Sequence, residues 1–235
     1  MAEGAKGVRT PRTVFGGRVS ADTSRVTLVL LALNVAVFLA GFSSPDLDVR
    51  FGNLALAIGP QGLIGVADGE YYRLITAAFL HAGVFHLLMN MFALMTVGPQ
   101  LEQTLGRARY LALYLLSALG GSTLSYVLSE PGQLGVGASG AIFGLFGAYY
   151  VVVRRLGGDT GSILALLAIN LVITFAVPII DWRAHLGGLI VGTVFAAALA
   201  YAPRGPRRTP LHVGAGLAVG ALLVAVVLTR TGMLT

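Results

Sequence analysis

The chain has 235 residues, of which 56% are hydrophobic and only 11% are charged, and its mean hydropathy is +0.82. This composition excludes a water-soluble domain, because such a domain needs a polar shell around its apolar core. The formal net charge is +6, and the absence of cysteine excludes disulfides and thiol chemistry. We therefore predict an all-α polytopic membrane protein.

The first 25 residues are polar and basic, and an apolar run follows at 26–42. A segment with so little apolar surface cannot form a core, so we predict a mostly disordered cytoplasmic arm over residues 1–25. The run 26–42 is similar to the apolar part of a secretory signal peptide, with the small residues Ala40 and Gly41 near its end. Because six further apolar runs follow, an uncleaved signal-anchor is favoured over a cleaved signal peptide.

Seven apolar stretches are long enough to span a bilayer, which takes about 17 to 25 helical residues. Residues 43–81, between the first two, are too apolar for a solvated linker and too interrupted by Gly and Pro for a span. We predict that they lie in the outer membrane interface, with Tyr71, Tyr72 and Arg73 at headgroup depth. The seven stretches cover residues 26–42, 82–101, 108–129, 139–155, 161–178, 183–202 and 211–229.

The basic residues orient these seven spans, because loops rich in Lys and Arg stay in the cytoplasm. With the N-terminus in the cytoplasm and the C-terminus outside, twelve of the sixteen cations lie in cytoplasmic segments. This arrangement and the anionic inner leaflet account for the net charge, which gives no support to nucleic-acid binding. The twelve are Lys6, Arg9, Arg12, Arg18, Arg25, Arg107, Arg109, Arg154, Arg155, Arg204, Arg207 and Arg208.

Four polar side chains lie inside or at the edge of these apolar stretches: His86, Asn90, Ser139 and His185. A polar residue placed in hydrocarbon is costly and is therefore a candidate functional residue. His86 and Asn90 are four residues apart and share one helix face. Since spans two, four and six all run from outside to inside, the four residues are expected at one level near the outer surface.

Small residues indicate which of these helices touch. Gly140 and Gly144 form a small-residue face on span four, and Gly188 and Gly192 form another on span six. Such faces let helix backbones approach closely in lipid, although each set alone is also explained by ordinary bundle packing. His185 lies three residues before Gly188 and shares its face, so a hydrogen bond from Ser139 to His185 is geometrically reasonable.

The four polar residues fit the requirements of acyl transfer. A serine hydroxyl needs a nearby base to become a good nucleophile, and the imidazole of His185 is suitable. The side chains of His86 and Asn90, with the backbone N–H of Ser139, are suitable donors to an oxyanion. Asp181 precedes His185 by four residues, but we expect it to be a helix cap or a surface charge. These residue types predict a Ser-His dyad rather than a triad.

Several motifs resemble those of the rhomboid family of intramembrane serine proteases. They are Gly137-Ala138-Ser139-Gly140, His86-x-x-x-Asn90 with His81 five residues earlier, and Ala184-His185-Leu186-Gly187-Gly188. Asn34 in the first span, and Glu102 to Gly106 after the second, are also similar. The resemblance covers about residues 25–202. It implies a rhomboid-like catalytic membrane domain of six helices over 26–202, followed by a basic loop and a seventh, C-terminal transmembrane helix over 203–235.

The resemblance also implies an activity, a place and a set of roles. The chain is expected to be an intramembrane serine endopeptidase of a bacterial plasma membrane, without cofactor or metal, that cleaves single-pass or polytopic membrane proteins near the outer face. Ser139 is then the nucleophile, His185 the general base, and His86 and Asn90 the oxyanion hole. Phe143 stands where many members have Tyr, and Tyr72 where many have Trp. The expected supporting residues are Gly137, Gly140, Phe143, Gly188, His81 and Glu102.

Two non-enzymatic classes compete with this hypothesis. A transporter would favour broken helices with paired charges and an internal repeat, and neither is visible in the sequence. A rhomboid-like pseudoprotease would bind transmembrane helices without cutting them. It is disfavoured because Ser139 and His185 are both present.

Overall fold

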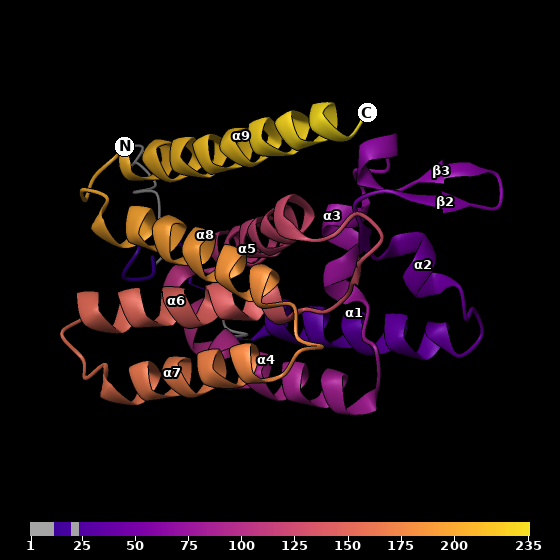
Figure 1. Ribbon diagram of the computed structural model, residues 1–235. Coiled ribbons are helices and arrows are strands. Elements are labelled where there is room, and N and C mark those ends of the chain that lie inside the picture. Colours follow the sequence, from indigo (N-terminus) through magenta and orange to yellow (C-terminus); the bar gives the residue numbers. More distant parts are fainter. Residues whose placement is uncertain (1–11, 20–23) are drawn as a thin grey trace, which may run out of the picture.

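A computed structural model describes residues 12–19 and 24–235 of the chain. Long helices lie side by side and form a bundle (Figure 1). Each of the seven apolar stretches lies on one of these helices, because a chain in hydrocarbon must satisfy its backbone hydrogen bonds internally. The helices are α1 (Arg25–Gly41), α4 (Val84–Leu105), α5 (Arg107–Leu128), α6 (Ser139–Arg155), α7 (Gly161–Ala176), α8 (Trp182–Tyr201) and α9 (Arg208–Leu234).

Four helices of the described part of the chain, α4, α5, α8 and α9, are long and apolar enough to cross a membrane. Helices α1 and α7 are also apolar but have only 17 and 16 residues. Helix α6 has 17 residues, most of them buried within the bundle, so neighbouring helices rather than lipid surround it. The protein is therefore an all-α polytopic membrane protein, and a topology of seven spans stays a prediction.

Helices α5, α6 and α8 pack at backbone distance in the centre of the bundle. A Cβ atom added at Gly188 of α8 would overlap the Gly140 carbonyl of α6, and one at Gly192 would overlap Gly144. A third small-residue face, on α5, completes the contact: a Cβ at Gly121 would lie 2.7 Å from the Ala184 carbonyl oxygen. The glycines thus bring the first turns of α6 and α8 together.

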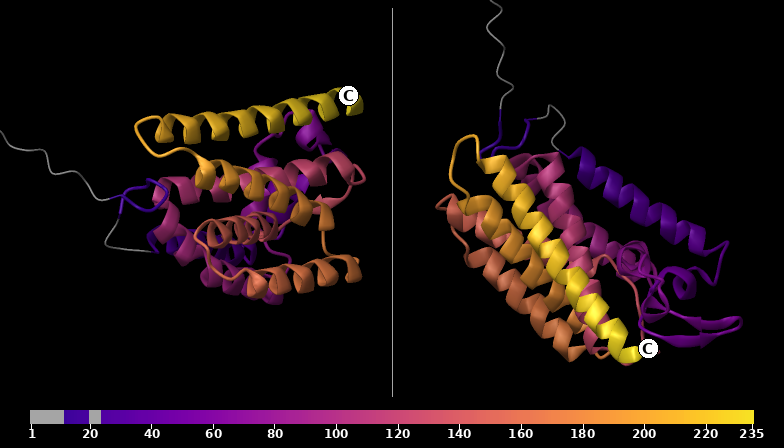
Figure 2. Two further views of the ribbon diagram at one scale, coloured as in Figure 1. Left: turned by 90° about the vertical axis from the view of Figure 1, so that its left-hand side faces the viewer. Right: turned by 90° about the horizontal axis from the view of Figure 1, so that it is seen from above.

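Helix α9 lies along α5 and α8, on the opposite side of the bundle from α7 (Figures 1 and 2). Polar contacts hold it near both of its ends. Arg109 Nε donates to His212 Nδ1 at 2.8 Å, and the hydroxyls of Tyr126 and Thr231 are 2.8 Å apart. Most of its other side chains face outward. The helix therefore adds to one flank of the bundle and leaves the α4 and α7 flank uncovered.

The connection between α1 and α4 contains short elements that fold against the bundle. Strand β1 pairs antiparallel with β4, and β2 with β3. Arg73 organises this segment, since its guanidinium donates to Glu70 at 2.7 Å and to the Val49 and Gly52 carbonyls at 2.6 and 3.0 Å. The elements of this connection are α2 (Leu47–Phe51), β1 (Asn53–Leu54), β2 (Ala57–Gly59), β3 (Gly62–Ile64), η1 (Val66–Asp68), α3 (Arg73–Thr76) and η2 (Ala77–Phe79), whereas β4 (Leu134–Gly135) lies between α5 and α6.

Arg73 is buried within this segment. Tyr71 and Tyr72 are exposed, whereas Arg73 is only 2% exposed; the headgroup depth of the three residues stays a prediction. A buried guanidinium needs several acceptors, and Glu70 with two backbone carbonyls provides them. The pKa of Glu70 reflects the same contacts: burial raises it, but hydrogen bonds from Arg73, Gly65 and Tyr72 outweigh burial and lower it.

The described residues 12–19 of the N-terminal arm are folded, within a segment 1–25 that the sequence predicts to be mostly disordered. Residues 12–19 form a tight turn in which Phe15 is 2% exposed. Arg208 donates to the Val14 carbonyl at 2.9 Å, and Gly17 packs against the junction of α4 and α5. The turn is held by the Phe15 ring and the Arg208 side chain. One phenylalanine in a basic segment does not indicate a folded turn, so the sequence did not predict it. Residues 1–11 and 20–23 lie outside the described residues.

Glu102, near the end of α4, supports the first turn of α1. Its carboxylate accepts from the backbone N–H groups of Val26 and Thr27 and from the Thr27 hydroxyl, each at 2.9 Å. The first N–H groups of a helix have no partner within the helix, and the Ser24 side chain does not cap them here. Glu102 therefore has a structural place at the end of the bundle opposite Ser139.

Candidate active site

Ser139 is the first residue of α6, and the segment before it is held in place from two sides. β4 pairs with β1, and the Gly137 N–H donates to the Ala77 carbonyl at 2.9 Å. Gly137 has φ +135°, and a Cβ there would lie 2.7 Å from His86 Cε1 and 3.7 Å from Ser139 Oγ. Only glycine combines this backbone conformation with this space. Gly137 therefore lets the His86 ring approach the turn that presents Ser139.

His185, in the first turn of α8, lies flat against an aromatic ring of α6. Its ring stacks on Phe143 with centroids 4.1 Å apart and an interplanar angle of 16°. Phe143 follows Ser139 by one helical turn and so shares its face. The imidazole thus lies beside the face of α6 that carries Ser139. The phenylalanine supplies the apolar support, and the stack needs no hydroxyl.

Asp181 is the N-cap of α8, which confirms the prediction that it is a cap. Its carboxylate accepts from the backbone N–H groups of Arg183 and Ala184 at 3.1 and 3.2 Å and from the Ser125 hydroxyl at 2.5 Å. A carboxylate at this position satisfies helix N–H groups that have no other partner. Both carboxylate oxygens of Asp181 are thus bonded to groups other than the ring of His185.

A residue that the sequence did not single out contacts His185 instead. The Thr174 hydroxyl of α7 is 2.7 Å from His185 Nδ1, and Thr174 is 2% exposed. The signal was present in the sequence, because Thr174 and Asn170 are polar residues one turn apart in an otherwise apolar stretch. Among the described residues, no hydrogen bond joins the Ser139 hydroxyl to His185. Such bonds are often long in a free enzyme and tighten in the complex.

The first half of α4, with the segment just before it, holds three further candidates: His86 and Asn90 on the helix, and His81 three residues before the helix begins. The rings of His81 and His86 meet edge to face with centroids 5.1 Å apart. Asn90, 6% exposed, donates one amide hydrogen to the His86 carbonyl at 3.0 Å, and its amide group carries a second hydrogen. Burial, and secondarily the neighbouring His86, lower the pKa of His81 to about 4. His81 is therefore a neutral ring at pH 7.

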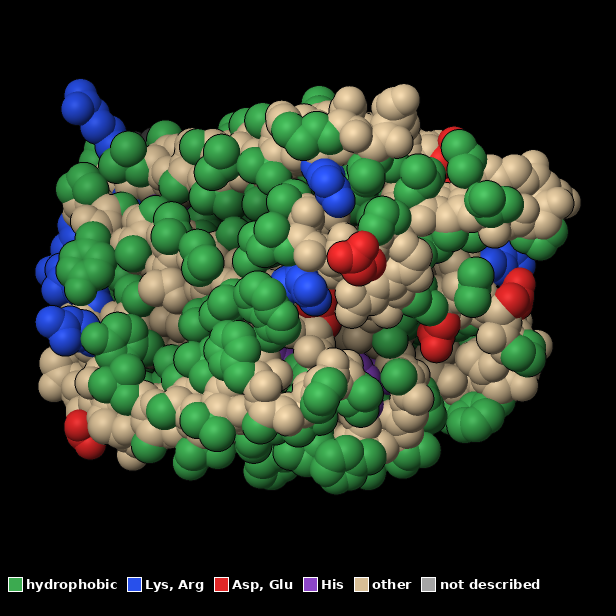
Figure 3. Space-filling model, viewed as in Figure 1, with side chains coloured by type: hydrophobic (Ala, Val, Ile, Leu, Met, Phe, Trp, Pro, Cys, Tyr) green, Lys and Arg blue, Asp and Glu red, His purple; other side chains and the backbone are tan. Residues whose placement is uncertain are grey.

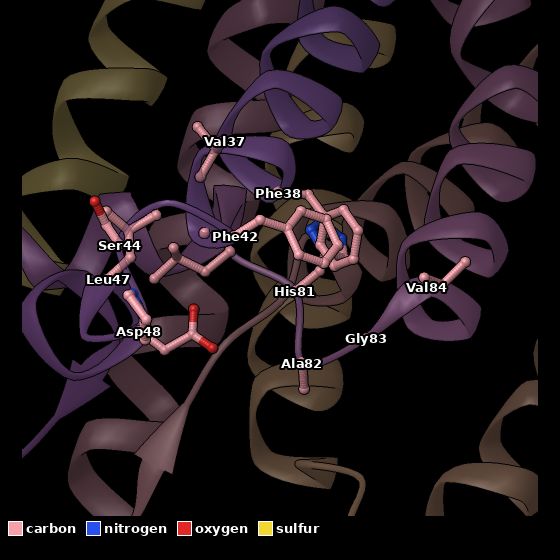
Figure 4. Close-up of a pocket in the computed structure, with 13 residues that line it drawn as sticks. Val37, Phe38, Phe42, Ser44, Leu47, Asp48, His81, Ala82, Gly83 and Val84 are labelled. Atoms are coloured by element: carbon pink, nitrogen blue, oxygen red, sulfur yellow. The ribbon is translucent and has the colours of Figure 1, made fainter.

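A cavity of about 300 Å³ lies next to this group of histidines, between the end of α1, α2 and residues 80–84. Figure 4 shows the His81 ring behind those of Phe38 and Phe42, with the Asp48 carboxylate on another side of the cavity. Burial raises the pKa of Asp48. The cavity combines apolar walls with a carboxyl group and an imidazole, and it reaches the ring that contacts His86.

The two ends of the bundle carry side chains of opposite charge. Basic side chains gather at the end where α6 finishes and the α8–α9 loop lies, as Figure 3 shows at the left. Ser139, His86 and His185 are each within the first four residues of their helices, and all three helices start at the opposite end. Most acidic side chains visible in Figure 3 lie toward that end. The N-terminus of α6 adds backbone N–H groups that favour negative charge there.

The arrangement places a hydroxyl, an imidazole and several N–H donors around the first turn of α6. A hydroxyl with a neighbouring imidazole is the combination used by serine hydrolases. Among residues 12–19 and 24–235, no group of three or more His, Asp or Glu side chains is placed to hold a metal ion.

The comparisons with known proteins agree with this arrangement. The family model described as "Rhomboid domain" matches residues 68–202. The "Putative rhomboid protease YdcA" of Bacillus subtilis (strain 168) is 44% identical over 134 residues, which are 55% of this chain and 67% of that protein. The "Rhomboid protease GluP" of the same organism is 36% identical over 186 residues, 74% of this chain but 34% of that protein.

A plant relative shows similar coverage. "RHOMBOID-like protein 5" of Arabidopsis thaliana is 35% identical over 159 residues, 64% of this chain and 51% of that protein. The matched segment thus spans about two thirds of the YdcA protein, about half of RHOMBOID-like protein 5 and about a third of GluP.

Proposed function

This chain belongs to the rhomboid family of intramembrane serine proteases, and from that premise we propose that it is itself an endopeptidase that cleaves transmembrane substrates with a Ser139–His185 dyad. The observation that carries the proposal is the position of His185. Its ring is stacked on Phe143, one turn after Ser139, on the same face of α6. A transporter or a helix-binding protein has no need of an imidazole stacked on a helix one turn after a serine.

The proposed reaction follows from the groups around the first turn of α6. His185 takes the proton of the Ser139 hydroxyl, and Ser139 Oγ attacks the carbonyl carbon of the scissile peptide bond. The negative charge that develops on the carbonyl oxygen is stabilised by the Ser139 N–H, the second amide hydrogen of Asn90, and His86. His185 then gives its proton to the leaving amine. Water, activated by the same imidazole, hydrolyses the acyl-enzyme.

The proposed substrates are membrane proteins whose helices unwind near the outer face. A regular helix shields its carbonyl groups, so the scissile segment must become extended before Ser139 can attack it. The uncovered flank of α4 and α7 supports entry of such a segment from the lipid, since α9 packs on the opposite side. Polytopic proteins with one locally unwound helix are candidates as well as single-pass proteins.

Labelling of the nucleophile tests the proposed activity directly. A fluorophosphonate probe reacts with a serine only where a base and oxyanion donors activate it. We expect the wild-type protein in detergent to be labelled at Ser139 and the Ser139→Ala variant to remain unlabelled. Heat-unfolded wild-type protein is the matched control and should also remain unlabelled. Equal labelling of the wild type and Ser139→Ala would rule out Ser139 as the activated serine.

We also propose that the basic end of the bundle faces the cytoplasm of a bacterial plasma membrane, which puts the candidate site near the outer face. The gathering of arginines at one end supports this orientation. The chain has no cysteine, so single cysteines report the side of the membrane without background. In intact cells, a membrane-impermeant maleimide should label Gln133→Cys and should reach Arg204→Cys only after lysis. The reverse pattern would invert the orientation.

A further inference from the structure

Helix α7 has a polar residue at one of its two buried positions. Its buried residues are Ile163, near one end, and Thr174, near the other. Its remaining side chains are exposed or half-buried, and most are apolar. A threonine buried on a helix with so much apolar surface is costly unless its hydroxyl is fully bonded, and Thr174 meets that condition through two short contacts.

The two contacts of the Thr174 hydroxyl determine which way each bond runs. Thr174 Oγ1 donates to the Asn170 carbonyl at 2.7 Å. A carbonyl oxygen only accepts, and a hydroxyl has a single hydrogen. The contact of Thr174 Oγ1 with His185 Nδ1, also 2.7 Å, therefore uses a lone pair of the oxygen. The hydrogen in that contact must come from the imidazole, so Nδ1 carries the proton.

We propose that Thr174 is the positioning residue of the catalytic base: it accepts from His185 Nδ1 and so holds the imidazole in the tautomer whose Nε2 is unprotonated. This inference rests on the proposed function. A general base needs its lone pair on the nitrogen that faces the nucleophile, and Nε2 is directed away from α7. Thr174 thus does with a neutral hydroxyl what the aspartate does in a Ser-His-Asp triad, which holds the tautomer and the orientation of the ring.

Two helices then share the task of fixing the base. Phe143 of α6 sets the plane of the ring by stacking, and Thr174 of α7 sets its rotation within that plane by the hydrogen bond. Of the other neighbours, Asp181 is engaged in capping α8. His86 belongs to the donors on α4. The dyad is thus complete as a positioned unit without a carboxylate.

Two substitutions separate the hydroxyl of Thr174 from its methyl group. Thr174→Val keeps the shape and removes the hydrogen bond, whereas Thr174→Ser keeps the hydrogen bond and removes a methyl group. In a cleavage assay with a transmembrane substrate in detergent, we expect Thr174→Val to lower kcat by at least about tenfold, part of the 10² to 10⁴ that a general base contributes. KM should change little. Thr174→Ser should retain most of the wild-type kcat.

Matched controls make the result specific. Thr229 of α9 makes the same bond to the carbonyl one turn earlier, at 2.8 Å to Ala225, and is exposed, so Thr229→Val should leave kcat unchanged. Thermal unfolding in detergent checks that Thr174→Val is folded. If it is not, Thr174→Ala and Thr174→Ser can be compared instead, since these two side chains differ only by the hydroxyl group.

The possible results separate this inference from the proposed function. The positioning role would be overturned by a wild-type kcat in Thr174→Val, or by a kcat that is lower in Thr174→Ser than in Thr174→Val. Either result would leave the proposed protease activity standing. A cleavage rate in the wild type no higher than in Ser139→Ala would instead overturn the proposed function itself.

Discussion

Replacing Ser139 or His185 by alanine should abolish cleavage of a transmembrane substrate while the protein stays folded. The expected loss is on the order of 10⁴-fold or more, as when a nucleophile or its base is removed from a serine protease. The two effects should not add, because nucleophile and base act as one unit. The measurement is initial cleavage rate in detergent, with size-exclusion profile and thermal midpoint as checks of folding.

The control for this experiment is a serine in the same protein with no proposed role. Ser162, exposed at the start of α7, serves this purpose, and Ser162→Ala should cleave at the wild-type rate. Wild-type turnover in either Ser139→Ala or His185→Ala would show that the dyad assignment is wrong. The double variant should be no slower than the slower single variant.

Replacing Gly188 by alanine should destabilise the whole bundle. The added methyl group would overlap the Gly140 carbonyl oxygen, and backbone atoms of two packed helices cannot rotate away as a side chain can. We expect a loss of about 3 kcal/mol in the free energy of unfolding, at the upper end of the usual cost of overpacking. Activity should fall as well, because separating α6 from α8 moves His185 away from Ser139. Thermal unfolding in detergent and cleavage rate measure the two effects.

A glycine without neighbours separates overpacking from helix propensity. Nothing lies within 4 Å of a Cβ built at Gly220 of α9. Alanine is favoured over glycine inside a helix by about 1 kcal/mol, so Gly220→Ala should unfold at the same temperature as the wild type or higher. A wild-type unfolding temperature for Gly188→Ala would mean that α6 and α8 do not pack at backbone distance.

The positions of the long helices were predictable from the sequence. An apolar stretch of membrane length has few alternatives to a helix, because lipid offers no partners for the backbone. The candidate residues were predictable for a related reason, since a serine or histidine in such a stretch stands out against its neighbours. Family membership, inferred from the order of the motifs, is confirmed by the match over residues 68–202 and by YdcA. The catalytic roles of Ser139, His185, His86 and Asn90 stay predictions.

Other features required the packed structure. The sequence indicates that Arg73 is an interfacial cation beside two tyrosines. Only the structure shows the Glu70 carboxylate and the backbone carbonyls that allow its burial. Residues 12–19 have a disordered composition, yet one buried phenylalanine holds them against α4 and α5. The glycine face of α5 was hidden among 32 glycines in the chain. Its role in helix packing is visible only in the structure, where Ala184 of α8 lies against it.

The sequence by itself therefore determined the membrane class, the helices and the four candidate residues, because hydrophobicity and local motifs act over short stretches of chain. Tertiary structure decided how those residues are used. The partner of His185 is Thr174, eleven residues earlier on another helix, and not Asp181 one turn away on its own. A hydrogen bond between helices depends on their relative rotation, which arises from packing the whole bundle and is not encoded in any one segment.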